Sequence, residues 1–164
     1  MIRAAIGLGA NLGDAAGSVR AAMDALAGLP ATTLQAASRF YRTPAWGVTA
    51  QPDFINAVAL VETTLSPRDL LDALLAIERS FGRTRLDGER WGPRTLDLDI
   101  LLFGNRLLSE ERLTVPHYHM HARAFVLYPL AEIAPPDLQL PDGRSLEQLL
   151  AACPFEGLER LVTP

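Results

Sequence analysis

Lysine is missing from this 164-residue chain, because all 15 of its basic residues are arginine. This absence excludes a Walker A phosphate-binding lysine, a Schiff-base lysine and the strand lysine of protein kinases. If the chain acts on phosphate groups, it must bind them with arginine, histidine, backbone amides or a metal ion.

Cysteine and long apolar runs are also scarce. Cys153 is the single cysteine, so no internal disulfide can form, and we expect it to be a small buried residue in a protein of the reducing cytoplasm. Gly, Asn and Asp soon interrupt the opening residues, MIRAAIGLGANLGD, and no apolar run approaches the ~18 residues of a membrane span. We therefore expect neither an export signal nor a membrane partner.

Excess positive charge is absent as well. The net charge of −4 argues against a general nucleic-acid-binding protein, whose surface should be basic. Hydrophobic residues make up 49% of the chain and charged residues 21%, which is typical of a globular protein. Because 164 residues suit one well-buried core, we expect a single domain over residues 1–164.

The pattern of apolar residues predicts strands that alternate with helices. Pro30 should end the first helix, while Ser66 as N-cap and Pro67 at the first helical position announce the second. The expected elements are a strand over 2–9, a helix over 15–29, strands within 32–43 and 54–64, a helix over 66–81 and a strand from 96.

This β-α-β-β-α-β order predicts an α+β fold, a ferredoxin-like sandwich with helices on one face of the sheet. Extra C-terminal elements should follow it. They are a short strand over 106–109, a helix from Ala122 and a helix around 146–152.

Two aspartates stand side by side in the stretch WGPRTLDLDILLFGN, residues 91–105. The two-residue period of a strand places both carboxylates on one face. That face should carry Asp97, Asp99, Leu101 and Phe103, and the other face Leu96, Leu98, Ile100 and Leu102. A solvated face would expose Leu101 and Phe103, so we favour an inner strand with the carboxylates at the mouth of a buried face.

Neighbouring carboxylates repel each other by ~3 kcal/mol at the effective dielectric of a protein surface. One or two Mg²⁺ ions would offset this repulsion, because Mg²⁺ takes a few carboxylates and fills its coordination shell with water and substrate phosphates. Five arginines precede the pair against two acidic residues: Arg79, Arg83, Arg85, Arg90 and Arg94 against Asp87 and Glu89. This pattern suits a polyphosphate held from both sides, although a solvated loop with Arg–Glu pairs would explain the arginines alone.

The segment VPHYHMHARAF places His117, His119 and His121 in alternation. Three imidazoles could form a zinc site, but no fourth ligand or hydrolytic base is evident beside them. We favour imidazoles and Arg123 that face phosphate, while His119 and His121 also fit surface positions.

Phe54 and Asn56 share a face of their strand, so an aromatic plane and an amide edge lie next to each other. A flat heterocycle would use both, whereas a core Phe and a strand-end Asn fit the pattern equally well. Trp46 and Trp91, both in predicted loops, add possible stacking surfaces. Glu78 interrupts the apolar side of its helix and fits a surface or a functional position equally.

Taken together, these motifs resemble the 6-hydroxymethyl-7,8-dihydropterin pyrophosphokinases of folate biosynthesis. The resemblance rests on RWGPRTLDLDILLFGN, on FYRTPAWG with QPDFINAV after it, and on LTVPHYHMHARAFVL followed by PLAEIAP. It covers nearly the whole chain from GLGANLGD onwards. It implies a ferredoxin-like enzyme that transfers the β,γ-pyrophosphoryl group of ATP to the hydroxymethyl oxygen of the pterin and releases AMP.

The resemblance also implies roles for individual residues, with ATP as co-substrate and two Mg²⁺ ions held by Asp97 and Asp99. Catalysis would involve these two aspartates, Arg83 and Arg94. The pterin would contact Thr43, Pro44, Trp46, Phe54, Asn56, Trp91 and Phe125, with the two Phe rings sandwiching it. ATP would contact Arg83, Arg85, Arg90, Arg94, the backbone of Ile100, Arg112, Thr114, His117, Tyr118 and Arg123. Arg90 and Trp91 would belong to a loop that closes over the site, and a monomer is expected.

Some positions depart from the family pattern. They are Ala10 where Ser is usual, Phe54 where Tyr also occurs, Leu75 where a polar ATP contact occurs, and Tyr118 where Pro is frequent. None of them removes a metal ligand. The alternatives from other function classes are a two-metal nucleotide cyclase or phosphodiesterase and a non-catalytic ligand sensor. The Phe54, Asn56 and Phe125 set argues against the former, and the aspartate pair argues against the latter.

Overall fold

The computed structural model describes residues 1–44, 52–81, 96–110, 113–117, 123–135, 138–155 and 157–161. The strands are β1 (Ile2–Ala10), β2 (Thr32–Ala37), β3 (Tyr41–Thr43), β4 (Phe54–Thr63), β5 (Asp97–Phe103), β6 (Leu108–Glu110), β7 (Leu113–Val115) and β8 (Glu159–Arg160). The helices are α1 (Ala15–Ala27), α2 (Pro67–Ser80), α3 (Ala124–Ile133) and α4 (Leu146–Ala151). The fold is therefore a mixture of helices and strands, as the sequence predicted.

Six strands form one antiparallel sheet: five follow the order β5-β1-β4-β3-β8, and β2 pairs with β4. The long strand β4 pairs with β1 along its whole length, while its other edge pairs first with β3 and then with β2. Strands β6 and β7 form a separate antiparallel pair. Strand β1 thus lies in the middle of the sheet, between the aspartate-bearing β5 and the Phe54-bearing β4.

The first two helices begin at side-chain caps that the sequence makes possible. Asp14 accepts a hydrogen bond from the Gly17 N–H at the start of α1, and Ser66 accepts one from the Asp69 N–H at the start of α2. Each cap satisfies an N–H group that has no partner inside its helix. The predicted second helix is confirmed, and the first ends two residues earlier than predicted, at Ala27.

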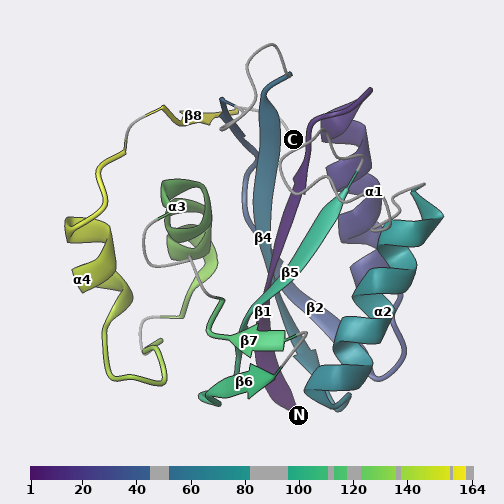
Figure 1. Cartoon of the computed structure of the whole chain (residues 1–164), viewed down its shortest axis with the longest axis vertical. Helices are drawn as coiled ribbons and strands as arrows, with labels where there is room; N and C mark the ends of the chain where they lie inside the picture. Colours follow the sequence, from purple (N-terminus) through teal and green to yellow (C-terminus); the bar gives the residue numbers. More distant parts are fainter. Residues whose placement is uncertain are drawn as a thin grey trace.

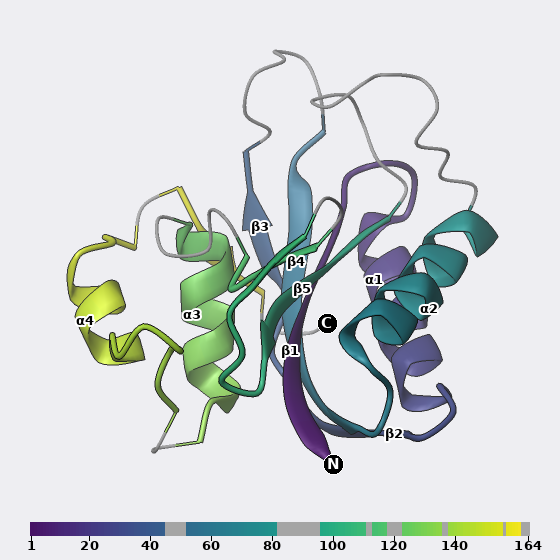
Figure 2. The same ribbon diagram turned by 60° about the horizontal axis from the view of Figure 1, so that its bottom comes forward.

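The two helices of the predicted β-α-β-β-α-β unit lie on one face of the sheet, and the further helices cover the other face (Figure 1). Helices α1 and α2 lie on one side and α3 and α4 on the other, an arrangement that persists when the molecule is turned (Figure 2). The chain beyond β5 forms α3 and α4, and their apolar residues become buried by packing against this second face of the sheet. No helix in the described part of the chain is both long and apolar enough to span a membrane.

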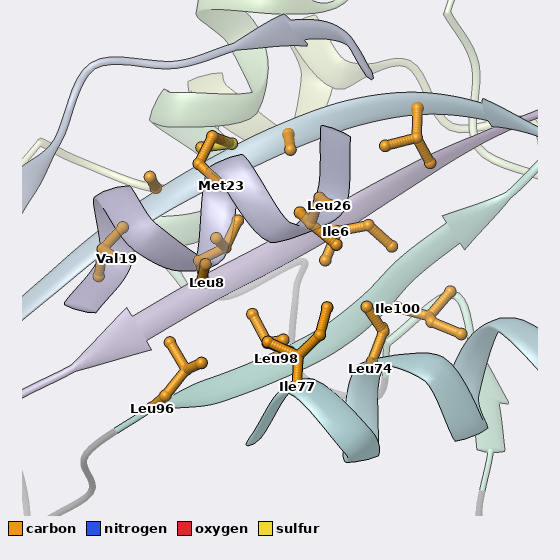
Figure 3. Packing of buried hydrophobic residues seen from close by; sticks show 14 of the residues in the cluster. Ile6, Leu8, Val19, Met23, Leu26, Leu74, Ile77, Leu96, Leu98 and Ile100 are labelled. Carbon is orange, nitrogen blue, oxygen red and sulfur yellow. The ribbon is translucent and has the colours of Figure 1, made fainter. Parts of the chain in front are cut away.

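The first core lies between the sheet and helices α1 and α2. Figure 3 shows Ile6 and Leu8 of β1 facing side chains from both helices, among them Leu26 and Leu74. These residues are almost completely buried. Alternate residues of β1 supply this core, which is the period expected of a strand with one side against helices.

The second core lies under α3 and α4, and it corrects the predicted faces of β5. Leu101 and Leu102 both pack in this core, whereas Phe103 packs in the first one. The reason is a register shift between Ala5 and Ile6, opposite which β5 accommodates an extra residue. Such a bulge moves every later side chain to the other face.

Two smaller predictions also differ in position. The predicted strand over 106–109 is β6 (Leu108–Glu110), and the helix expected from Ala122 is described from Ala124. Cys153 is buried in the second core, as expected, and burial raises the pKa of its thiol.

Candidate functional site

Strand β1 carries two glycines on the face that α3 covers. Gly9 pairs with Asp97 of β5 on one side and with Asn56 of β4 on the other, while Gly7 pairs with Asp99. Residues directly opposite each other in an antiparallel pair project from the same face. This face therefore presents both aspartates on one side of β1 and Asn56 on the other.

The two glycines let neighbouring side chains approach the β1 backbone closely. A Cβ atom added to Gly9 would lie 2.9 Å from Asn56 Oδ1, and one added to Gly7 would lie 3.3 Å from Leu101 Cδ2. Neighbouring strands are ~4.8 Å apart, so ~10 Å separates the backbones of Asp97 and Asn56. Glycine inside a strand is a sequence signal for a close approach, and it is the signal that could have revealed this feature.

The two carboxylates lie near the start of β5, an edge strand of the sheet, and both side chains are half-buried. His117 follows β7 and brings an imidazole to this place, with Nε2 3.9 Å from Asp99 Oδ2. The His117 N–H donates to the Leu101 carbonyl, 2.9 Å away, which fixes the backbone of this residue against β5. The structure thus brings together three predicted site residues from two separate motifs.

Glu78 is a residue whose role sequence reasoning left open. Its side chain is buried at 2% exposure, and its Oε2 accepts a hydrogen bond of 2.8 Å from the Leu98 N–H. Leu98 lies between Asp97 and Asp99, so this carboxylate holds the edge of β5 at the centre of the acidic pair. The sequence signal was a glutamate inside the apolar stripe of an amphipathic helix, where an ion needs a buried partner.

On the other side of β1, Asn56 is oriented by a neighbouring strand. Its Nδ2 donates to Thr43 Oγ1 at 3.1 Å, and both side chains are buried. Phe54 pairs with Thr43 and is half-buried, and Pro44 follows at an exposed position. An amide edge and an aromatic ring therefore border the same region of the sheet.

Asn11, in contrast, is a residue that the sequence patterns did not single out. It is almost completely buried just beyond β1, and its Nδ2 donates to the Pro52 carbonyl at 3.1 Å. This contact ties the end of β1 to the segment that enters β4. An asparagine directly after a buried strand is a common turn signal, which made it easy to read as a turn residue only.

The first turn of α3 contributes Phe125, the second of the two predicted stacking phenylalanines. Phe125 is half-buried against the second core, and the Arg123 guanidinium carbon lies 5.4 Å from the centre of its ring. Arg123 is the N-cap residue of α3, without a side-chain cap hydrogen bond. The guanidinium lies over the ring of this candidate stacking residue, so it places positive charge at this end of α3.

Two predicted ATP contacts occupy different environments. The Ile100 side chain packs in the first core, so a ligand on the α3 face could reach only the Ile100 backbone. Thr114 is exposed on β7. Outside the described residues lie Trp46, Arg83, Arg85, Arg90, Trp91, Arg94, Arg112, Tyr118, His119 and His121.

The aspartate pair has the chemistry of a Mg²⁺ site. Two half-buried carboxylates on one face supply hard oxygen ligands, and Mg²⁺ fills the rest of its coordination shell with water or phosphate oxygens. Among the described residues, no group of three or more His, Cys, Asp or Glu side chains is arranged to hold a metal ion. A pair of carboxylates suits Mg²⁺, which keeps several non-protein ligands.

Comparison with known proteins gives the family. The model of the 7,8-dihydro-6-hydroxymethylpterin-pyrophosphokinase (HPPK) family matches residues 5–135. A Pseudomonas aeruginosa protein named 2-amino-4-hydroxy-6-hydroxymethyldihydropteridine pyrophosphokinase is 60% identical over 159 residues, which are 97% of this chain and 96% of that protein. A protein of the same name from Haemophilus influenzae is 51% identical over 92% of this chain and 92% of its own length. Another from Methylorubrum extorquens is 45% identical over 98% of this chain and 99% of its own length.

Solved structures share the fold at low sequence identity. A crystal structure of HPPK-DHPS in complex with substrates has a TM-score of 0.66 and 13% identity, and it covers 92% of this chain and 43% of its own. Wild-type Plasmodium falciparum HPPK-DHPS with SDX-DHP has a TM-score of 0.66 and 15% identity, with 93% of this chain and 43% of that chain covered. The present chain thus spans less than half the length of these proteins.

The match of the family model and the identities with three bacterial relatives confirm the resemblance that the motifs suggested. They also confirm the predicted class of enzyme, a pyrophosphokinase that transfers a phosphorus-containing group. On this basis, the chain belongs to the 7,8-dihydro-6-hydroxymethylpterin-pyrophosphokinase family.

Proposed function

We propose that this chain transfers the β,γ-pyrophosphoryl group of ATP to the hydroxymethyl oxygen of 6-hydroxymethyl-7,8-dihydropterin, with release of AMP, in folate biosynthesis. One observation carries the proposal beyond the family name. Asp97 and Asn56 flank the same glycine of β1, so a phosphate-binding half and a heterocycle-binding half meet on one face of the sheet.

In the heterocycle half, Asn56 offers an amide edge that complements the donors and acceptors of a pterin ring. Its amide nitrogen is already bonded to Thr43, which selects one orientation of the side chain. Phe54 from β4 and Phe125 from α3 supply aromatic faces on which the ring can stack. Pro44 and Trp46, the latter outside the described residues, are further proposed pterin contacts.

In the phosphate half, Asp97 and Asp99 would hold Mg²⁺, with two ions expected. When bound, the metal neutralises negative charge on the phosphate oxygens and orients them for in-line transfer. His117 lies beside Asp99 and Arg123 at the start of α3, both in places from which they can approach phosphate oxygens. Thr114 and the Ile100 backbone are the other described residues proposed to contact ATP.

The remaining proposed contacts come from outside the described residues. Arg83 and Arg94 would act on the transferred group, and Arg85, Arg90, Arg112 and Tyr118 would also bind ATP. Trp91 would close over the pterin as part of a lid that excludes water, which otherwise competes for the phosphorus. Transfer of this kind depends on positioning and charge neutralisation, so no protein base is assigned.

We also propose that the architecture is the ferredoxin-like sandwich expected from the sequence, in one domain and as a monomer of the cytoplasm. The strand order β5-β1-β4-β3, with two intervening helices on one face, supports the fold assignment. In that topology, the four strands of the β-α-β-β-α-β unit pair in an antiparallel sheet with the first strand inside.

The direct test is an assay with purified protein, ATP, Mg²⁺ and the reduced pterin in which AMP is quantified. We expect AMP to form in equal amount to the pyrophosphorylated pterin, and neither product to form without pterin. Release of cyclic nucleotide or ADP would favour another phosphoryl-transfer reaction. Ligand binding without turnover would favour the sensor.

A further inference from the structure

Three polar side chains form a cluster beside the pterin half of the site, here called the Tyr41 cluster. It consists of Tyr41 from β3, Glu132 from α3 and Arg160 from the C-terminal strand β8. Tyr41 is fully buried, while the Glu132 and Arg160 side chains are 23% and 47% exposed. The cluster therefore connects three elements that are distant in sequence.

Each member contacts the other two. The Tyr41 hydroxyl donates to Glu132 Oε2 and accepts from Arg160 Nε at 3.1 Å, and Arg160 Nε lies 3.7 Å from Glu132 Oε2. The Arg160 guanidinium carbon also lies 5.6 Å from the centre of the Tyr41 ring. Glu132 Oε1 accepts from the Arg39 N–H at 3.0 Å, which adds the backbone just before β3 to the network.

The cluster is adjacent to the residues proposed to bind the pterin. Tyr41 pairs with Asn56, so the two side chains project from the same face in neighbouring strands. Thr43, whose hydroxyl orients the Asn56 amide, lies two residues farther along the same short strand. A shift of β3 would therefore move the amide edge directly.

The cluster also reaches the aromatic residue on α3. Phe125 and Glu132 are seven residues apart, almost two helical turns, so they lie on the same side of α3 with ~10 Å of helix between them. Glu132 anchors one end of the helix to β3, and Phe125 stands in the turn at the other end. Rotation or tilt of α3 at Glu132 would change the position of the Phe125 ring.

We propose that Arg160 is a positioning residue for pterin binding, acting through Tyr41 and Glu132 on the placement of β3 and α3. The inference rests on the proposed function of the site, and it assigns a role to a residue beyond the 5–135 range that defines the family match. Arginine suits the role because one guanidinium donates to the hydroxyl, stays charged beside the carboxylate and lies near the ring.

The test compares Arg160→Gln with Glu159→Gln, a matched control in the same strand. Glu159 forms an exposed ion pair with Arg42 at 3.3 Å, so its change perturbs β8 without removing a member of the cluster. Pterin is titrated calorimetrically into protein saturated with a non-hydrolysable ATP analogue and Mg²⁺, and the analogue is titrated separately. Melting curves establish that each variant is folded.

For Arg160→Gln we expect the pterin Kd to rise about threefold to tenfold, the scale of one coupled contact, while the Kd of the ATP analogue stays within about twofold. Glu159→Gln should leave both values unchanged. Arg160→Lys keeps the charge without the planar fork and should restore part of the affinity. Because Arg160 is proposed to act through Tyr41, the effects of Tyr41→Phe and Arg160→Gln should not add. The double variant should have a pterin Kd no higher than that of the single variant with the higher Kd.

Equal weakening of pterin and analogue would show a general structural role and overturn the inference, as would unchanged pterin affinity in Arg160→Gln. In both cases wild-type binding of pterin would leave the proposed function intact. A wild-type protein that binds the analogue but no pterin would overturn the proposed function and this inference together.

Discussion

At the scale of single residues, the candidate site combines two charged residues on β5 with two glycines at the paired positions of β1. Asp97 and Asp99 bring two negative charges to one face, and Gly9 and Gly7 opposite them add no Cβ atoms to fill it. The charges and the glycines belong to different residues, so single substitutions can test the effect of charge and the effect of an added side chain separately.

We expect Asp97→Asn and Asp99→Asn each to lower turnover about a hundredfold or more, because each removes a charged ligand from the proposed Mg²⁺ site. In metal-free buffer the melting temperature should hold or rise, since the substitution also removes repulsion between the two carboxylates. AMP production and thermal melts measure the two effects. Asp72→Asn, an exposed position on α2, is the control, and near-wild-type turnover by either site variant would contradict the metal assignment.

Gly9→Ala should weaken pterin binding without removing any polar group. The new Cβ would lie 2.9 Å from Asn56 Oδ1, which must move although its amide nitrogen is held by Thr43. We expect a loss of about 1–3 kcal/mol in pterin binding, the scale of a lost hydrogen bond at a buried amide, measured by calorimetry. Gly28→Ala is the control, because its Cβ would meet ordinary contacts of 3.7 Å at a negative φ. Equal affinities for the two variants would show that the pterin does not bind beside Gly9.

At the scale of elements, the site depends on how β4, β5 and α3 are held against their neighbours. Strand β4 presents Phe54 and Asn56, α3 packs against the same strand, and β5 brings the acidic pair from the opposite edge of β1. Each element also has an anchor remote from the ligands. For β5 it is Glu78 on α2, and for α3 it is the second core together with the Tyr41 cluster.

Phe125→Ala and Phe54→Ala should each weaken pterin binding by about 1–3 kcal/mol, the scale of one aromatic stack, and leave nucleotide affinity nearly unchanged. Calorimetric titration with each ligand separates the two effects. Phe155→Ala is a matched control, because this ring is 44% exposed and packs edge-on against Tyr128. Equal losses for pterin and ATP would mean that the rings are packing residues.

Glu78→Leu should lower the free energy of unfolding by about 1–3 kcal/mol, because the Leu98 N–H then loses the carboxylate to which it donates. The Mg²⁺ concentration for half-maximal activity should also rise, since Leu98 lies between the two aspartates. Thr63→Val serves as the control: it removes the acceptor of the Leu65 N–H, also in a buried place, but away from β5. A similar Mg²⁺ requirement in both variants would limit Glu78 to a role in stability.

At the scale of the whole molecule, one sheet separates two cores. The first core joins α1 and α2 to the sheet and the second joins α3 and α4 to its other face, so β1, β4 and β5 contribute to both. Residues of the first core therefore help to stabilise the strands that carry the candidate site on the second face. The expectation of a single domain follows from this sharing.

Leu74→Ala and Leu130→Ala test that expectation, because both side chains are completely buried, one in each core. Each should lower the free energy of unfolding by about 2–5 kcal/mol and shift one common thermal transition by ~2–4 °C per kcal/mol. Leu107→Ala, at a position 67% exposed, should change little. Two separate transitions, of which each core variant moves only one, would show that the cores unfold independently.

The sequence by itself determined the features that depend on neighbours along the chain. The cap at Ser66, the stop at Pro30, the apolar stripe of α2 and the alternation around Asp97 are local patterns, and they predicted the main helices and the paired carboxylates. The ordered motifs were also sufficient to identify the family, because they are specific in type and spacing.

Only the tertiary structure decided the features that depend on pairing between distant segments. The bulge opposite Ala5 and Ile6 sends Phe103 to the other face, although the two-residue period alone placed it beside the aspartates. The covering of the second face by α3, the capping of the β5 edge by Glu78 and the meeting of Asp97 and Asn56 across Gly9 are likewise outcomes of register and packing. A periodic pattern carries no information about its partner strand, so these arrangements become definite only when the sheet is assembled.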